Sequence, residues 1–182
     1  MRKIHLILGI GLLSLGAKAQ PIDIGAALPA VTIERGGEIL LNDAKVSLHP
    51  WHSETLVQGK KQLIIHVAGR LSAKQQLENV ILSLQPLGLS QQGIATTTIV
   101  DLDDSLWGSS PFVEQSIIGS KKNQPDNHFV LDKSGIAAHR WQLLAHSAAV
   151  ILVNPQGQVQ FFQQAPFSSQ QIQQLIRELE KK

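Results

Sequence analysis

Apolar residues along the chain follow two spacings, one typical of buried strands and one typical of helices. Residues 62–68 form an almost continuous apolar run, the pattern of a strand that is buried on both faces of a parallel sheet. After Gly69, apolar residues recur at the i, i+3, i+4 and i+7 spacing of an amphipathic helix, at Leu77, Val80, Ile81 and Leu84. The pattern predicts a buried strand followed by a helix that packs on the sheet.

The ends of this helix are also predicted. Ser72 and Gln75 have the spacing of a capping box, in which the serine hydroxyl accepts from the amide of residue 75 and the glutamine reaches back. Pro86 and Gly88 predict where the helix stops. The same capping pattern recurs at 168–171, before a second apolar stripe that predicts a C-terminal helix covering one sheet face.

Three later segments are typical of strands. Residues 94–100 are rich in β-branched side chains, and 128–131 are mostly apolar. Residues 149–153 and 158–162 flank a proline and a glycine placed as in a type I turn, so they predict a hairpin.

The connections between these strands are less regular. Residues 105–127 predict one helix inside a loop-rich stretch, and the segment 135–141 fits either a hairpin partner or a short helix. Near the start, 31–34 and 39–41 predict an N-terminal hairpin joined at Gly36-Gly37. Because strands separated by helices pair in parallel through right-handed crossovers, the order of elements predicts an α/β sandwich with an antiparallel edge.

The first nineteen residues have the pattern of a secretory leader. Two basic residues precede an apolar run from Ile4 to Leu15, which is too short to span a bilayer, and Ala17-Lys18-Ala19 has the small-x-small form of a cleavage site. A membrane-anchoring first helix is the alternative, but no second apolar span follows. We expect cleavage after Ala19, a single domain over residues 20–182, a periplasmic location, and no stable membrane insertion of the mature chain.

The composition excludes several classes of function. The leader holds three of the 16 basic residues and none of the 14 acidic ones, so the mature net charge is −1. The remaining basic residues are scattered, which argues against a nucleic-acid partner. The chain contains no cysteine, which removes disulfides, thiolate metal ligands and thiol nucleophiles together. It also has no phosphate-binding glycine loop, so no cofactor is expected.

Several phrases of the sequence resemble a known group of proteins. The order of elements, with Asp132-Lys133-Ser134-Gly135 before the last hairpin, is similar to the thioredoxin-like superfamily. Residues 66–74, 96–104 and 138–142 resemble the YtfJ family of small periplasmic proteins, over nearly the whole mature chain. The resemblance implies a thioredoxin-like three-layer sandwich whose central mixed sheet carries an N-terminal hairpin extension.

The resemblance does not extend to redox chemistry. Thioredoxin-like enzymes carry cysteine where the buried strand turns into its helix, because a helix N-terminus lowers a thiol pKa. Here that corner is residues 69–74, which hold no sulfur, and 147–149 lack the proline expected before the Val150 strand. The activity that the superfamily implies therefore does not transfer to this chain.

The same corner is the first candidate binding site. It follows a central parallel strand, where open α/β sheets bind ligands, and Arg70, Leu71, Ser72 and Lys74 suit an anion or an acidic peptide. The alternative is that Ser72 only caps the helix while Arg70 and Lys74 are solvated charges.

Three acidic residues end the next strand. Asp101, Asp103 and Asp104 are expected beside that corner. Carboxylates so placed suit Mg²⁺ or Ca²⁺, but the spacing lacks the glycine and distal glutamate of an EF-hand, so an Asp-rich loop that caps the next helix is favoured and no metal site is predicted.

Histidines and tryptophans give weaker signals. His49 to His52 reads as a surface loop with a packed tryptophan, and His66 as a hydrogen-bonded core residue. His128, His139 and His146 are too dispersed to support an argument. Trp107 and Trp141 suit either a partner anchor or the core.

These observations favour a non-redox binding or interaction module for a periplasmic protein, a peptide or a small anion. A hydrolase that uses Ser72 with Lys74 lacks identifiable oxyanion donors. Transcriptional regulation, a label attached to some proteins that resemble this family, is opposed by the leader, the net charge and the lack of a helix-turn-helix pattern.

Overall fold

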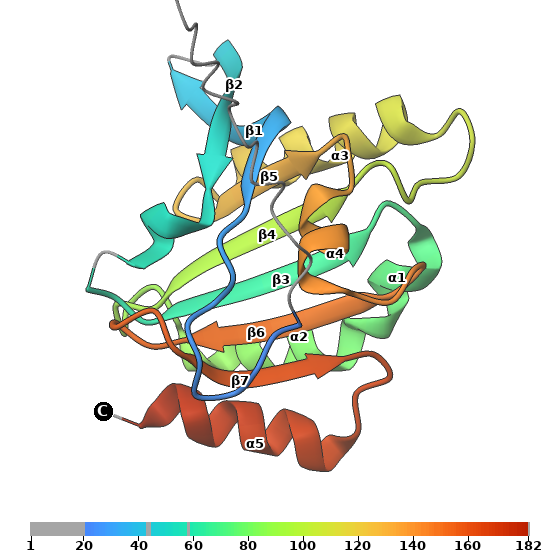
Figure 1. Cartoon of the computed structure of the whole chain (residues 1–182). Coiled ribbons are helices and arrows are strands. Elements are labelled where there is room, and N and C mark those ends of the chain that lie inside the picture. Colours follow the sequence, from blue (N-terminus) through green and yellow to red (C-terminus); the bar gives the residue numbers. More distant parts are fainter. Residues whose placement is uncertain (1–20, 43–44, 58, 182) are drawn as a thin grey trace, which may run out of the picture.

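The computed structural model describes residues 21–42, 45–57 and 59–181 (Figure 1). The predicted leader and its cleavage site lie outside these residues. In chain order the strands and helices are β1 (Thr32–Asn42), β2 (Lys45–His52), η1 (Ser53–Val57), β3 (Gln62–Ala68), α1 (Leu71–Gln76), α2 (Glu78–Leu84), η2 (Gln85–Leu87), β4 (Ala95–Asp101), α3 (Ser110–Asn123), β5 (His128–Asp132), α4 (Ile136–Trp141), β6 (Ala148–Val153), β7 (Val159–Gln164) and α5 (Ser169–Glu180).

One mixed sheet runs through the molecule in the order β2-β1-β5-β4-β3-β6-β7. The strands β3, β4 and β5 are parallel, as predicted for strands joined by helical crossovers. The strand β6 runs antiparallel to β3 and forms the predicted hairpin with β7. The segment 135–141 was predicted to be either a hairpin partner or a short helix, and residues 136–141 form the helix α4.

Each face of the sheet buries a separate apolar cluster. One cluster joins Leu63 and Ile65 of β3 to apolar residues of α1, α2 and α5. The other joins Ile64 and Ile151 to Trp141 of α4, and residues of the N-terminal segment and η1 complete it. Figure 1 shows α4 in front of the strands and α2 behind them. The predicted three-layer α/β sandwich is confirmed.

An N-terminal hairpin is present, but it is not the predicted one, because residues 31–34 and 39–41 do not pair with each other: the hairpin joins β1 to β2. Gly36 and Gly37 lie inside β1, which continues to Asn42 before the chain returns as β2. Both glycines have positive φ, at 106° and 86°, and both pair with β5. A Cβ at either position would collide with backbone, at Leu131 or at His49, so the glycines permit β1 to lie close to its neighbouring strands at an irregularity in the β1–β2 register.

The predicted capping box at Ser72 is also wrong. The helix α1 begins at Leu71 with Arg70 as its extended N-cap, and no side chain caps it. The Gly69 amide still pairs with the Asp101 carbonyl of β4 at 2.8 Å, and the Arg70 amide then donates back to the Ala68 carbonyl at 2.7 Å, so the chain turns at Arg70. The helix predicted through Leu84 is divided at Leu77 into α1 and α2. In contrast, the capping box of Ser168 with Gln171 is confirmed at the start of α5.

The segment from His49 to His52 is a strand rather than the predicted surface loop. It forms the end of β2, and its pairing with β1 places Trp51 opposite Ile33. The prediction that this tryptophan is packed is confirmed, because Trp51 is buried. The interior proline is accommodated because β2 is the edge strand of the sheet.

Candidate functional site

A pocket of about 560 Å³ opens where the parallel strands β3, β4 and β5 end. Its lining includes His66 at the end of β3, Arg70 at the turn into α1, and Asp101 at the end of β4. Asp103, Asp104, Gly135 and the segment 142–146 before β6 complete much of the wall. The expectation that the aspartates lie beside the corner of Arg70 is confirmed as a matter of geometry.

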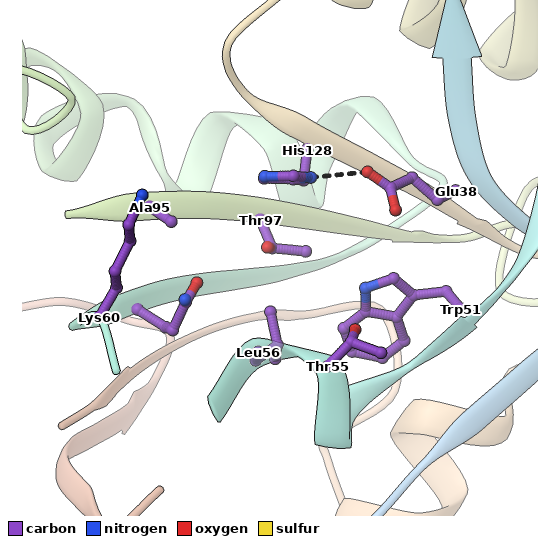
Figure 2. Close-up of a pocket in the computed structure, with 9 residues that line it drawn as sticks. Glu38, Trp51, Thr55, Leu56, Lys60, Ala95, Thr97 and His128 are labelled. Carbon is purple, nitrogen blue, oxygen red and sulfur yellow. Dashed lines mark hydrogen bonds and ion pairs between the residues drawn. The ribbon is translucent and has the colours of Figure 1, made fainter. Parts of the chain in front are cut away.

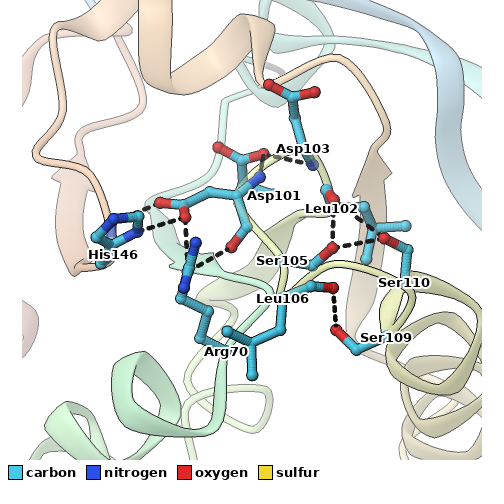
Figure 3. Close-up of polar contacts among 10 residues, drawn as sticks. Arg70, Asp101, Leu102, Asp103, Ser105, Leu106, Ser109, Ser110 and His146 are labelled. Carbon is cyan, nitrogen blue, oxygen red and sulfur yellow. Dashed lines mark hydrogen bonds and ion pairs between the residues drawn. The ribbon is translucent and has the colours of Figure 1, made fainter.

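Asp104 is the centre of the polar contacts at this edge (Figure 3). Its carboxylate accepts from Arg70 Nε at 2.7 Å and contacts His146 Nδ1 at 2.6 Å, and the His146 amide also donates to it. Partial burial would raise the pKa of Asp104, but the hydrogen bonds from His146 and Arg70 outweigh it and lower that pKa. Asp104 thereby ties together the turns that follow β3 and β4 and the loop before β6.

Asp101 has a different environment, although it is only three residues away. Its carboxylate is buried and accepts from the amides of Asp103 and Asp104 at 3.0 and 3.1 Å. Burial raises the pKa of Asp101 to about 6, and the nearby carboxylates of Asp132 and Asp104 act in the same direction against those backbone hydrogen bonds. A carboxyl with such a pKa exchanges a proton close to neutral pH.

His66 is a buried histidine in the lining of the pocket. Burial lowers its pKa to about 4, although the charge of Asp104 acts in the opposite direction, so the imidazole is neutral near pH 7. Its Nε2 is shielded from solvent, and none of the described residues forms a hydrogen bond with it. The prediction of a hydrogen-bonded core histidine is therefore wrong at this nitrogen. A buried polar atom without a partner is rare and indicates a ligand position, a water position or a local energetic penalty.

The other residues of the predicted corner lie outside the pocket. Leu71, Ser72 and Lys74 are exposed on α1, and none of them lines it. Ser72 and Lys74 are two positions apart on a helix and so do not face each other, which leaves the serine without that lysine as its base. The structure thus brings together Arg70, Asp101, Asp103 and Asp104 but not the anion-binding group predicted on α1.

Sequence reasoning missed the histidines of the site. His139 and His146 are distant from the corner in sequence, yet both line the pocket. His146 has a positive φ of 59°, uncommon for a residue other than glycine, and this conformation accompanies its hydrogen bonds to Asp104. A polar residue within an apolar strand marks His66, Asp101 and Asp132, but no such signal marks His139 or His146, which lie outside the strands.

No group of three or more His, Asp or Glu side chains that could hold a metal ion occurs within residues 21–42, 45–57 and 59–181. Asp101 is occupied by backbone amides, and Asp104 by Arg70 and His146. Asp103 is exposed at the rim.

Several segments that lead from the ends of β3 and β4, or into β6, carry exposed apolar side chains, of which Leu144 lines the pocket. They are carried by the start of α1, the loop after β4, the start of α3 and the loop before β6, at Leu71, Leu106, Trp107, Phe112 and Leu144. Figure 3 shows Leu106 on the same loop as Ser105. Serine hydroxyls brace this loop, since Ser105 donates to the Leu102 carbonyl at 2.8 Å and Ser109 to the Leu106 carbonyl at 2.7 Å. We call these five apolar side chains the apolar rim.

Solved structures define the class of this fold. The thioredoxin domain of a thiol-disulfide oxidoreductase from Bacteroides vulgatus aligns with a TM-score of 0.56 at 12% identity, covering 88% of this chain and 99% of that domain. A thiol peroxidase from Chromobacterium violaceum aligns with a TM-score of 0.55 at 15% identity, covering 91% and 92%. The chain is a thioredoxin-like protein in fold, and because it contains no cysteine it supplies no thiol for either chemistry.

The family follows from sequence similarity. The chain belongs to the family described as "Bacterial protein of unknown function (YtfJ_HI0045)", which matches residues 22–182. It is 35% identical over 181 residues to the uncharacterized protein YtfJ of Escherichia coli (strain K12), covering 100% of this chain and 97% of that protein. An uncharacterized protein of Haemophilus influenzae is 29% identical over 158 residues, covering 87% and 85%. The predicted family is confirmed.

None of the helices in the described part of the chain is both long and apolar enough to cross a membrane.

Proposed function

We propose that this chain is an exported, non-redox binding module, and that its pocket at the carboxyl ends of β3, β4 and β5 holds a segment of a partner polypeptide. The observation that carries the proposal is the apolar rim, of which Leu144 lines the pocket and the other members lie on neighbouring segments, together with the buried, unpartnered His66 nitrogen. Exposed apolar side chains that gather beside a polar pocket are typical of sites for other proteins. The leader predicted at residues 1–19 supports export.

Charge in the pocket favours a basic segment over the anion expected from sequence. That expectation relied on Arg70 and Lys74, but Arg70 is paired with Asp104 and Lys74 lies outside the pocket. The lining holds one arginine against three aspartates. We therefore propose a partner segment with a lysine or arginine between apolar side chains, so that the basic group meets the aspartates and its neighbours pack on the apolar rim.

Isotope-labelled NMR of the chain tests this proposal with three blocked tripeptides, Leu-Lys-Phe, Leu-Glu-Phe and Leu-Gln-Phe, and with inorganic phosphate. We expect the lysine peptide to shift the amides of Arg70, Asp104 and His146 in a saturable way, and the glutamate peptide and phosphate to shift them little. A stronger response to phosphate or to the glutamate peptide would overturn the proposed charge preference.

Two matched variants separate the apolar rim from general surface effects. Leu106 in the rim is 58% exposed, and Leu82 on α2 is 57% exposed. Leu106→Ala should weaken binding of the lysine peptide by about three- to tenfold, because part of the apolar contact is lost. Leu82→Ala should leave the affinity unchanged. Equal affinities in both variants would remove the rim from the site.

A further inference from the structure

A second pocket lies on the same face of the sheet, at the end where β3 and β4 begin. It has a volume of about 310 Å³, at the lower end of the range of roughly 300–1,000 Å³ for small-molecule sites. Side chains from β1, β2, η1, β3, β4 and β5 line it (Figure 2). It shares no lining residue with the pocket at the carboxyl ends, so it is a separate place for a ligand.

A buried hydroxyl forms part of its floor. Thr97 is completely buried in β4, and no described residue forms a hydrogen bond with its Oγ1. Its neighbours on this side are Gln62, which is also buried and lines the pocket, and Ile64, which pairs with Thr97 across the two strands. Because an unpartnered buried hydroxyl is energetically unfavourable, Thr97 indicates a position where a ligand supplies the missing partner.

Groups of opposite charge flank this floor. Figure 2 shows the Lys60 ammonium near Ala95 on one side of Thr97, and the pair of Glu38 with His128 on the other. The Glu38 Oε1 to His128 Nδ1 distance is 2.6 Å. The hydroxyl, the Gln62 amide and the Lys60 ammonium all offer hydrogen-bond donors, whereas Glu38 offers acceptors.

The remaining wall is apolar. Trp51 is buried at the end of β2, and Leu56 of η1 is buried beside the pocket. Figure 2 places both side chains below the line that joins Thr97 to Glu38. An indole and a leucine suit an aromatic or branched apolar group of a ligand.

We propose that this pocket binds a small zwitterion of the amino-acid class. Its carboxylate would face Thr97 and Lys60, its ammonium would face Glu38, and its apolar side chain would pack on Trp51 and Leu56. Lining groups of both charge signs, with an apolar wall between them, match a ligand that carries both signs on an apolar body.

Calorimetric titration of the chain tests this with L-phenylalanine and two analogues that each lack one charged group, 3-phenylpropanoate and 2-phenylethylamine. We expect saturable binding of L-phenylalanine and at least tenfold weaker binding of either analogue. NMR shifts should occur at Thr97 and Trp51 and not at Arg70 or His146. No saturable heat with the amino acid, shifts at the other pocket, or equal binding of all three compounds would overturn the proposal.

Three variants identify the groups that bind. Thr97→Val keeps the shape but removes the hydroxyl, so it should weaken L-phenylalanine binding about fivefold or more and leave the Tm of the free chain unchanged or higher. Lys60→Met should weaken binding at least as much, whereas Lys45→Met, also exposed but outside the pocket, should not. If Thr97→Val and Lys60→Met both bound as the unaltered chain does, the pocket would not be the site.

Discussion

The two faces of the sheet differ in what the central strands bury. Towards α1, α2 and α5, the strand β3 presents only apolar side chains, at Leu63, Ile65 and Val67. Towards α4, the three parallel strands each alternate polar, apolar, polar at every second position: Gln62, Ile64, His66 in β3; Thr97, Ile99, Asp101 in β4; His128, Val130, Asp132 in β5. The first face is a continuous core, and the second is a core only across its middle.

The residues that stabilise the fold are therefore different from the residues that line the pockets. Ile64, Ile99 and Val130, the apolar member of each set of three, join the apolar cluster that contains Trp141, so they hold α4 to the sheet. Gln62, Thr97 and His128 line one pocket, and His66 and Asp101 line the other, at the opposite end of the strands. One face therefore supplies much of the apolar burial, while the other leaves hydrogen-bonding groups at both ends of the parallel strands.

Replacing one buried residue on each face of the sheet should give the largest difference in the free energy of unfolding. Leu63→Ala removes a fully buried side chain from the continuous core and should lower the free energy of unfolding by about 2–5 kcal/mol. His66→Leu removes a buried nitrogen that no described residue satisfies and, near pH 7, where the imidazole is neutral in both states, should change the free energy of unfolding by no more than about 1 kcal/mol in either direction. Urea denaturation measures both, and a larger loss for His66→Leu would contradict the contrast.

The pH dependence of stability sharpens the same comparison. The pKa of His66 is lowered to about 4, so between about pH 4 and 6.5 the unfolded chain binds a proton that the folded chain does not, and His66 makes stability rise with pH. The pKa of Asp101 is raised to about 6, so between about pH 4 and 6 the folded chain holds a proton that the unfolded chain has lost, and Asp101 makes stability fall with pH.

These two contributions oppose each other and can be separated by substitution. As the pH rises from 4 to 6, the stability of His66→Leu should fall relative to that of the unaltered chain, and the stability of Asp101→Asn should rise relative to it. Denaturation at several pH values measures both differences. Parallel curves for either variant and the unaltered chain would show that its residue has the same pKa in the folded and unfolded states.

The smallest effect on stability is expected at the apolar rim. Trp107 is fully exposed, so Trp107→Ala should change the free energy of unfolding by less than about 0.5 kcal/mol. Trp141→Ala is the internal control, because that indole is buried and donates to the Pro29 carbonyl at 2.8 Å. It should cost about 3–5 kcal/mol. Thermal unfolding of both variants would reveal whether Trp107 has a structural role instead.

Local sequence signals predicted much of the fold. The apolar run of β3, the β-branched residues of β4 and the capping box of α5 were all sufficient, because these signals depend on neighbours in the chain. The predictions failed at Gly36-Gly37 and at Ser72. There the outcome depends on contacts with distant segments, namely β5 and the Asp101 carbonyl.

The candidate site was predicted only in part, because several of its contacts also join segments that are distant in the sequence. Arg70 and Asp104 were expected side by side because parallel strands end at one edge of a sheet. Their ion pair, which removes Arg70 from the anion site expected there, was not apparent from spacing. His146 was missed because it reaches Asp104 across 42 positions of sequence.

The sequence by itself determined that this protein carries no thiol chemistry and that its strands and helices alternate as in an α/β sandwich. These properties follow from composition and from periods of two and 3.6 residues, which are local. Only the tertiary structure decided which polar side chains are neutralised, which are left without partners and which pockets they line. Those outcomes are set by the register between strands, which brings Thr97 beside His128 and Asp101 beside Asp132, and no local pattern fixes that register.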